Sequence, residues 1–381
     1  MRVAVVAGAD PGHVFPAIAL CLRFLEAGDV PTLCTVDPWV DAAAELGIGV
    51  VRLNGLAPGR ELDLGRALHD RAAMLAPALA PLLTDLEPDL VVCDVIAQGG
   101  GMAAELAGVP WVQLSPHPLY EPSRGLPPIG AGLAAGVGVT GKLRDAALRA
   151  AASRSIRRGD QQRARARQSI GLAARGPGPA VRLIATLPAL EVPRPDWPSN
   201  TYVVGPLLWE AARQRLAPPP GDAPLVVIAP STASSGAAGL AEMAIDALRG
   251  MEVRAVVSTF GPAPADLPEW ARSGQGRQDE LLSEAAVVVC GGGHGLLAKA
   301  LLAKVPAVLV PGGGDQWEMA NRVARHGSGV LVRPSTVDTL RAAVTRVLGD
   351  PSFAAAAALA GASAADVLDP VEVCRAALRS S

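Results

Sequence analysis

The chain has 381 residues, of which half are hydrophobic and only 18% are charged, and its formal net charge is −2 at pH 7. A chain of this length is expected to fold into two domains, each with a sizeable core. The near-neutral charge and the low aromatic content of 3% argue against a nucleic-acid partner, because such partners need basic or stacking surfaces.

The cysteine pattern and the N-terminus indicate a protein of a reducing compartment. Five cysteines are scattered along the chain without C-x-x-C spacing, which predicts free thiols and no zinc site. Gly8, Asp10 and Pro11 interrupt the first apolar run, so we expect no signal peptide. No stretch reaches the roughly 18 uninterrupted apolar residues of a membrane span. We therefore expect a cytoplasmic monomer or homodimer.

Short apolar runs alternate with helical stretches in the first half of the chain. The predicted strands are 3–7, 32–36, 48–53, 89–94 and 109–115, and the predicted helices begin near Pro16 and Trp39 or span about 61–84 and 98–107. Almost wholly apolar strands are typical of parallel sheets with helices on both faces.

A proline-rich stretch separates this part from a second alternating pattern. After it, strands are predicted at 224–229, 253–259, 285–290, 305–310 and 329–332. The pattern predicts an α/β protein of two doubly wound domains that face each other across a cleft. The expected parts are an N-terminal domain (1–205), a linker (206–222), a C-terminal domain (223–360) and a final helix (361–381) packing back toward the N-terminal domain.

Two polar residues follow strands that should be neighbours in the first sheet. If its order is 3-2-1-4-5, His13 after the first strand and Asp94 at the end of the fourth converge on the crevice where ligands bind. An imidazole held by a carboxylate suits a general base. The alternative is a histidine bonded locally at a helix start and an aspartate that caps the next helix. The shared location favours the base.

Two glycine-rich turns of the second half predict a ligand site. In "VVVCGGGHGLLAKAL" (287–301) a strand ends at Cys290 and a helix begins near His294, which suits an anion such as phosphate. A plain strand-to-helix connector is the alternative. In "VPGGGDQWEMANRV" (310–323), Asp315 and Gln316 suit hydrogen bonds to a polyol. The alternative is that Asp315 is a helix N-cap and Gln316 faces the solvent.

Several segments together resemble the family 1 nucleotide-sugar glycosyltransferases of GT-B fold, particularly the bacterial enzymes that modify natural products. "GHVFP" (12–16) is similar to the family's G-H-x-x-P, "YVVGPLLW" (202–209) contains its V-G-P, and "ALLAKVPAVLVPGGGDQWEMANRV" (300–323) is similar to its A-L-x-x-G-V-P…D-Q-x-x-N-A-x-R-V. The resemblance covers nearly the whole chain. It implies an inverting transfer from a nucleoside-diphosphate sugar, with UDP or dTDP, to a hydroxyl of a small acceptor.

The resemblance also assigns roles to residues. It makes His13 the base and Asp94 its partner, and it implies neither a metal site nor a cofactor besides the nucleotide sugar, since no D-x-D motif is present. The residues expected near the donor are Ser231, Thr232, Arg277, Gln278, Gly291, Gly292, Gly293, His294, Gly295, Asp315 and Gln316. Gly12 and His117 are expected beside the acceptor.

The chain departs from the family's donor-binding pattern. The position of the diphosphate-binding histidine is Gly291, that of the Ser/Thr is Leu296, and that of the asparagine in D-Q-x-x-N is Met319. Backbone amides, helped by His294 or by Ser231 and Thr232, are then expected to hold the diphosphate; weakened donor binding is the alternative. Lys299, where plant enzymes carry a ribose-binding glutamate, favours dTDP or another nucleotide over a plant-type UDP contact.

The arginine-rich stretch 142–167 is best explained as a solvated helix, although it can also attract an acidic acceptor or give a peripheral membrane contact. His69 and His326 are predicted on helix surfaces. Three other functions stay open: a MurG-like transferase acting on a lipid-linked sugar, a nucleotide-sugar epimerase, and a non-catalytic GT-B scaffold that binds a nucleotide or a partner.

Overall fold

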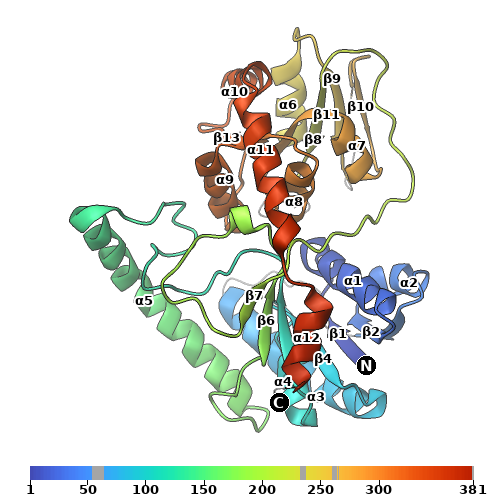
Figure 1. The fold of residues 1–381 in the computed structure, drawn as a ribbon, viewed down its shortest axis with the longest axis vertical. Helices are drawn as coiled ribbons and strands as arrows, with labels where there is room; N and C mark the ends of the chain where they lie inside the picture. The colour runs from blue at the N-terminus through green and yellow to red at the C-terminus, as the bar shows by residue number, and fades with distance from the viewer. Residues whose placement is uncertain (54–63, 232–236, 260–263, 265, 380–381) are drawn as a thin grey trace.

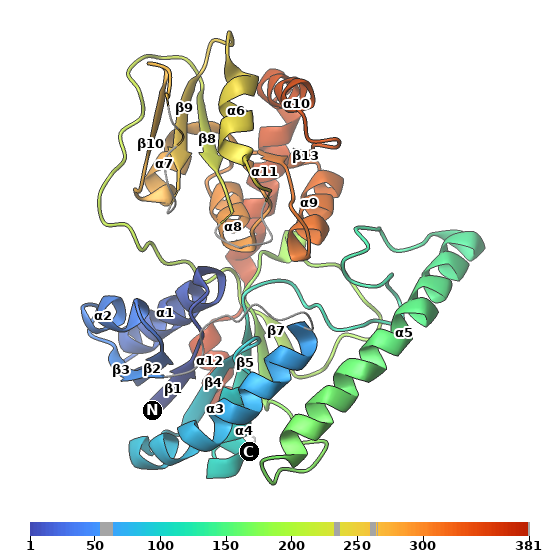
Figure 2. The ribbon, with the colours of Figure 1, turned by 180° about the vertical axis from the view of Figure 1, so that it is seen from behind.

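The computed structural model describes the chain except residues 54–63, 232–236, 260–263, 265 and 380–381. Two α/β domains are stacked along the long axis of the molecule (Figure 1), with the N-terminal half forming the lower one. Figure 2 shows the same two domains from behind.

The N-terminal domain is built on a parallel seven-stranded sheet of order β3-β2-β1-β4-β5-β6-β7. The direction in which successive strands are added reverses at β1, which pairs with both β2 and β4. Ligands of such sheets bind beyond the carboxyl ends of the strands at this point. The strands are β1 (Arg2–Val6), β2 (Val30–Thr35), β3 (Gly49–Arg52), β4 (Leu90–Asp94), β5 (Trp111–Ser115), β6 (Val181–Ile184) and β7 (Thr201–Val203).

Helices cover both faces of this sheet. The strand residues that point to either face are therefore apolar. Val3 and Val5 pack with α1, α2 and α12 on one face, and Ala4 and Val6 pack with α3 and α4 on the other. The helices of the N-terminal domain are α1 (Pro11–Glu26), α2 (Trp39–Ala44), α3 (Leu64–Leu86), α4 (Gly99–Ala107), α5 (Gly138–Gln168) and the 3₁₀ helix η1 (Pro188–Leu190).

The C-terminal domain repeats this architecture with a six-stranded parallel sheet of order β10-β9-β8-β11-β12-β13. Its strands are β8 (Leu225–Ala229), β9 (Arg254–Ser258), β10 (Ala271–Gly274), β11 (Ala285–Cys290), β12 (Ala307–Leu309) and β13 (Gly329–Leu331). Its helices are α6 (Leu240–Leu248), α7 (Gln278–Glu284), α8 (His294–Leu302), α9 (Asp315–His326), α10 (Val337–Gly349) and α11 (Ser352–Ala362).

The end of the chain returns to the first domain. After α11 and the 3₁₀ helix η2 (Ser363–Asp366), α12 (Pro370–Arg379) packs on α1 and β6. The stretch Ser352–Arg379 is long and apolar enough to cross a membrane by composition alone. In the fold it is two separate helices, and they bury Ala357 in the core of one domain and Cys374 in the core of the other.

The predicted pair of doubly wound domains is confirmed, but some details differ from the sequence-based expectation. Strands β6, β7 and β10 were not predicted, because they are three or four residues long and lack an extended apolar run. His69 was expected on a helix surface, and this expectation was wrong. Its side chain lies on α3, which is covered by α4 and α5, and the residue is 5% exposed.

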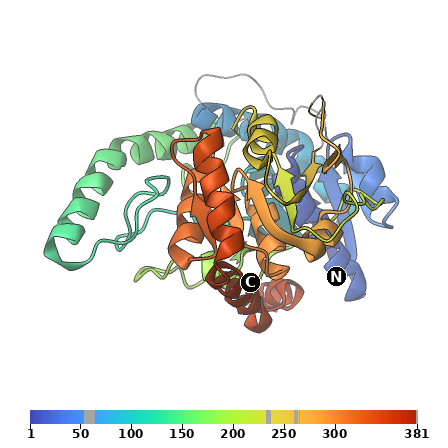
Figure 3. The ribbon, with the colours of Figure 1, turned by 90° about the horizontal axis from the view of Figure 1, so that it is seen from above.

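The long helix α5 lies to one side of the two domains (Figure 3). It belongs to the excursion between β5 and β6, and its contacts with other helices are made mainly with α3. Most of its side chains are exposed. The cost of leaving this helix largely uncovered is low because its sequence is strongly polar.

Candidate active site

The start of α1 carries His13 to the edge of the first sheet. Asp10 caps the helix, since its Oδ1 accepts a hydrogen bond of 2.7 Å from the amide of Gly12, and Pro11 occupies the first helical position. Both choices are favourable at a helix N-terminus. Gly12, predicted beside the acceptor, is therefore part of this cap.

Asp94 ends β4 and meets His13 at the switch point of the sheet. Its side chain is fully buried, Oδ1 accepts a hydrogen bond of 3.0 Å from the amide of Ile96, and Oδ2 lies 2.9 Å from Nδ1 of His13. The hydrogen bond to Asp94 engages Nδ1 and orients the imidazole. Nε2 is the ring nitrogen that Asp94 does not contact. A neutral imidazole with Nδ1 protonated presents a basic nitrogen at Nε2.

Carboxylates dominate the electrostatics of His13. Burial by itself lowers the pKa of His13, but the charge and hydrogen bond of Asp94, with smaller contributions from Asp10 and Asp315, outweigh it and raise the pKa above its ordinary value of 6.5. Asp315 belongs to the start of α9 in the other domain, so both domains contribute to the field at this nitrogen.

His117 lies beside His13, on the loop that follows β5. The two rings are 6.3 Å apart in an edge-to-face arrangement, and His117 stacks on Tyr120 at 4.3 Å. Nδ1 of His117 is 2.8 Å from the carbonyl oxygen of Pro118, and burial lowers the pKa of the ring. His117 is thus a neutral wall residue next to the predicted base.

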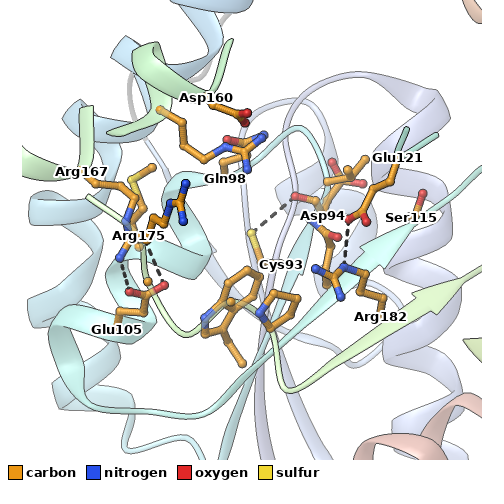
Figure 4. A pocket seen from close by; sticks show the side chains of 18 of the residues that line it. Cys93, Asp94, Gln98, Glu105, Ser115, Glu121, Asp160, Arg167, Arg175 and Arg182 are labelled. Atoms are coloured by element: carbon orange, nitrogen blue, oxygen red, sulfur yellow. Dashed lines mark hydrogen bonds and ion pairs between the residues drawn. The ribbon is translucent and has the colours of Figure 1, made fainter. Parts of the chain in front are cut away.

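A cavity of about 890 Å³ opens beside these residues in the N-terminal domain. Asp94 and Ser115 lie on one side of it, and Glu105 of α4 and Arg167 of α5 lie on the other (Figure 4). His117 also belongs to the lining. Asp94, the partner of His13, is thus shared between the histidine pair and the cavity lining.

Three residues predicted at the donor are in contact in the second domain. The amide nitrogen of the Gln316 side chain donates a 2.8 Å hydrogen bond to Oγ of Ser231, and its oxygen accepts one of 3.2 Å from the amide of Gly312. A Cβ at Gly291 would lie 2.8 Å from the Gln316 oxygen, so glycine at this position is explained by the close approach of Gln316. Gln316 therefore braces the site, and its contact with a sugar stays a prediction.

Asp315 and Gly292, which adjoin the Gln316 side chain or backbone, differ in exposure. Asp315 is exposed at the start of α9, and its contact with a sugar also stays a prediction. Gly292 has a φ of +93°, and a Cβ there would lie 3.1 Å from the Gln316 carbonyl oxygen. Thr232 lies outside the described residues.

The start of α8 offers free space for an anion. Gly293 is its N-cap, and a Cβ at Gly293 or Gly295 would meet no atom within 4 Å. Amides at a helix N-terminus attract phosphate groups. His294 instead turns to the other domain, where its Nε2 lies 2.8 Å from Oγ1 of Thr186. Burial, with Arg322 and His117 nearby, lowers the pKa of His294 to about 3, so its ring is neutral.

The two residues predicted near the nucleobase both have partners within the protein. Arg277 is bonded to Asp279, and Gln278 accepts from Nζ of Lys299 at 3.2 Å and lies 3.3 Å from Oγ of Ser258. Lys299 also forms an ion pair of 2.7 Å with Glu210 of the interdomain segment. These bonds organise the loop, and its contact with a base stays a prediction.

Sequence reasoning missed a charged contact between the domains. Arg322 of α9 is 3.1 Å from Glu318 on its own helix and 3.4 Å from Glu191 of the N-terminal domain, and it donates to the carbonyl of Leu190 at 2.9 Å. Oε2 of Glu318 in turn accepts hydrogen bonds from the amides of Gly130 and Gly132. The i, i+4 spacing of Glu318 and Arg322 was the available signal, but it does not reveal the partner domain.

The arginines of the cavity lining were also missed. Arg163 of the stretch 142–167, which was best explained as a solvated helix, lines the cavity together with Arg175 and Arg182. The amino-acid composition is sufficient to predict the charge of α5. Which of its side chains face the cavity depends on how the helix packs, and this could not be predicted.

Comparisons with known proteins show what the sequence resembles. Residues 258–378 match the model of the erythromycin biosynthesis protein CIII-like C-terminal domain. The chain is 28% identical to the 4'-demethylrebeccamycin synthase of Lentzea aerocolonigenes over 80% of this chain and 76% of that one.

Solved structures share the fold over the whole chain. The glycosyltransferase of kitacinnamycin superposes with a TM-score of 0.77 at 21% identity, covering 99% of this chain and 97% of that one. The Streptomyces sp. SF2575 glycosyltransferase SsfS6, complexed with thymidine diphosphate, gives 0.69 at 20% identity over 100% of both chains. The chain therefore has the GT-B fold of these structures, and its sequence resembles glycosyltransferases of bacterial natural-product pathways.

Proposed function

We propose that this enzyme transfers a sugar from a nucleoside diphosphate to a hydroxyl group of a small molecule, with inversion at the anomeric carbon. The observation that carries the proposal is the 2.9 Å contact of His13 with the buried Asp94, which also lines the cavity. A base held by a carboxylate beside an acceptor-sized cavity is the arrangement that activates a hydroxyl.

The step is a direct displacement. The acceptor oxygen attacks the anomeric carbon from the side opposite the diphosphate, and the bond from that carbon to the phosphate oxygen breaks with its electron pair. The acceptor proton passes to Nε2 of His13, because Nδ1 is bonded to Asp94. The imidazolium that forms is stabilised by that carboxylate.

The donor would lie against the second domain. The amides at the start of α8, with open space at Gly293 and Gly295, suit the negative charge that develops on the leaving diphosphate. Asp315 is exposed for hydrogen bonds to the sugar. A thymidine nucleotide is our preferred donor class, since a neighbour of the same fold binds thymidine diphosphate.

The reaction is proposed to need no divalent metal, because the helix amides take the role of a cation toward the diphosphate. Within the described part of the chain, no group of three or more His, Cys, Asp or Glu residues is arranged to hold a metal ion. All five cysteines are free and buried, which supports a location in the cytoplasm.

A donor and product assay tests the proposal. Thymidine diphosphate should raise the Tm, and the enzyme with dTDP-glucose or UDP-glucose and a panel of phenols should give a glucoside in the presence of EDTA. The α-linked donor should give a β-linked product, read from the anomeric proton coupling. His13→Ala should abolish turnover while the thymidine diphosphate shift persists, and His326→Ala at the far end of α9 is the control. A retained configuration or an active His13→Ala variant would overturn the mechanism.

A further inference from the structure

The cavity next to Asp94 has an apolar floor and a charged far end. Trp111 and Met102 line it together with the stacked pair of His117 and Tyr120. The flat rings of Trp111, His117 and Tyr120 suit a planar, aromatic molecule. In Figure 4, Asp94 and Ser115 lie on one side of the cavity, and the charged residues of α4 and α5 lie on the other.

Two of the four arginines that line the cavity are neutralised by the protein. Arg167 forms a two-pronged pair with Glu105, with distances of 3.1 and 2.6 Å, and both side chains are less than a tenth exposed. Arg182 lies 3.2 Å from Glu121 and donates to Oδ1 of Asn200 at 2.7 Å. These guanidinium groups are committed to structural contacts.

The backbone beside the buried pair brings Arg175 to the cavity. Nε of Arg167 donates to the carbonyl of Ala173 at 2.8 Å. A Cβ at Gly176 would lie 2.3 Å from a nitrogen of Arg167 and 2.7 Å from an oxygen of Glu105, so the chain passes directly over the pair. Figure 4 shows Arg175 next to Arg167 at this end.

Arg175 and Arg163 are the remaining arginines of the cavity lining. Both are exposed, and within the described residues no carboxylate forms an ion pair with either. The lining holds four arginines but, apart from Asp94 with its partner His13, only three carboxylates: Glu105, Glu121 and Asp160. Arg182 and Glu121 pair on the side of Asp94 (Figure 4), which leaves Arg163, Arg167 and Arg175 against Glu105 and Asp160, an excess of one positive charge.

We propose that the acceptor is a flat molecule with a carboxylate, which Arg175 binds with help from Arg163 while the hydroxyl at the other end meets His13. This inference rests on the proposed function, because it assumes that the cavity holds the acceptor. A guanidinium binds a carboxylate through two parallel hydrogen bonds. The same contact orients the molecule with its hydroxyl toward the base.

A matched pair of probes tests the charge. 6-Hydroxy-2-naphthoic acid and its methyl ester differ only in the anionic group, and their binding is measured by isothermal titration calorimetry. The acid should bind the wild type at least ~10-fold more tightly than the ester, as expected for a charge-assisted hydrogen bond. Arg175→Gln should remove this preference, and Arg175→Lys should restore part of it. Arg165→Gln, an exposed position of α5 outside the cavity lining, should leave it unchanged.

The outcomes separate this inference from the proposed function. Equal binding of acid and ester by the wild type, including no measurable binding of either, would overturn the inference, as would a preference that survives in Arg175→Gln. The Tm shift with thymidine diphosphate reports on the donor site and should be the same in Arg175→Gln and the wild type. Loss of that shift in the wild type, with the acid preference intact, would instead contradict the transferase.

Discussion

Arg322 of the C-terminal domain and Glu191 of the N-terminal domain form a buried ion pair at 3.4 Å, with the two side chains 3% and 9% exposed. The guanidinium also donates hydrogen bonds to Glu318 and to the carbonyl oxygen of Leu190. Glu191 accepts a hydrogen bond of 2.7 Å from the amide of Leu119, next to the cavity residue Tyr120. The helix that begins with Asp315 is therefore tied to the wall of the cavity.

Removing Arg322 should destabilise the protein. In Arg322→Met two nearly buried carboxylates, Glu191 and Glu318, lose their counter-charge, and we expect a loss of about 3 kcal/mol in the free energy of unfolding. Chemical denaturation measures it. Arg249→Met removes an exposed pair with Asp246 and should have little effect, since such pairs contribute little. Equal effects of the two substitutions would contradict the interpretation of the domain contact.

The pH dependence of the reaction should report on Asp94. His13 accepts a proton only when neutral, so kcat/KM should rise as the pH passes through the raised pKa of His13. Asp94 raises this pKa, and in Asp94→Asn the acid limb should therefore move to lower pH while the maximal rate falls. Asp10→Asn keeps a good helix cap and removes a weaker contribution, so it should move the limb less in the same direction. A limb that stays in place or moves to higher pH would show that another group is the base.

His294 should remain neutral throughout the working range. Its pKa is lowered to about 3 by burial and by nearby Arg322 and His117, so it cannot supply a positive charge to the diphosphate above about pH 5. A two-dimensional NMR titration of the histidine rings checks this. His294→Gln keeps a polar group near Thr186 and should bind thymidine diphosphate with unchanged pH dependence. Protonation of His294 near pH 6 would contradict this expectation.

The sequence was sufficient to predict the domain architecture, because apolar runs of five or six residues are needed wherever a parallel strand is covered on both faces. It also placed His13 and Asp94 at neighbouring strand ends, since the doubly wound order determines which loops meet. Strands such as β10, "ARSG", escaped prediction because their pairing comes from β9 and not from their own apolarity.

Contacts that depend on packing between distant segments could not be predicted. Nothing local to Gly291 indicates that its missing side chain makes room for Gln316. Likewise, the composition of α5 does not reveal that Arg163 faces a cavity while Arg165 does not. Periodicity gives the faces of a helix, but the choice of buried face needs the neighbouring element.

The glycines before α8 should separate stability from donor binding. Gly291→Ala places a Cβ 2.8 Å from the Gln316 oxygen, so the brace to Ser231 must shift; we expect a loss of about 1–3 kcal/mol in the free energy of unfolding, as for other overpacked sites. Gly293→Ala meets open space at a φ of −60° and should leave the Tm of the free enzyme unchanged. It should nevertheless weaken thymidine diphosphate binding several-fold, because its methyl group occupies the space proposed for the phosphates. Thermal unfolding with and without thymidine diphosphate measures both effects, and unchanged affinity in Gly293→Ala would show that the diphosphate lies elsewhere.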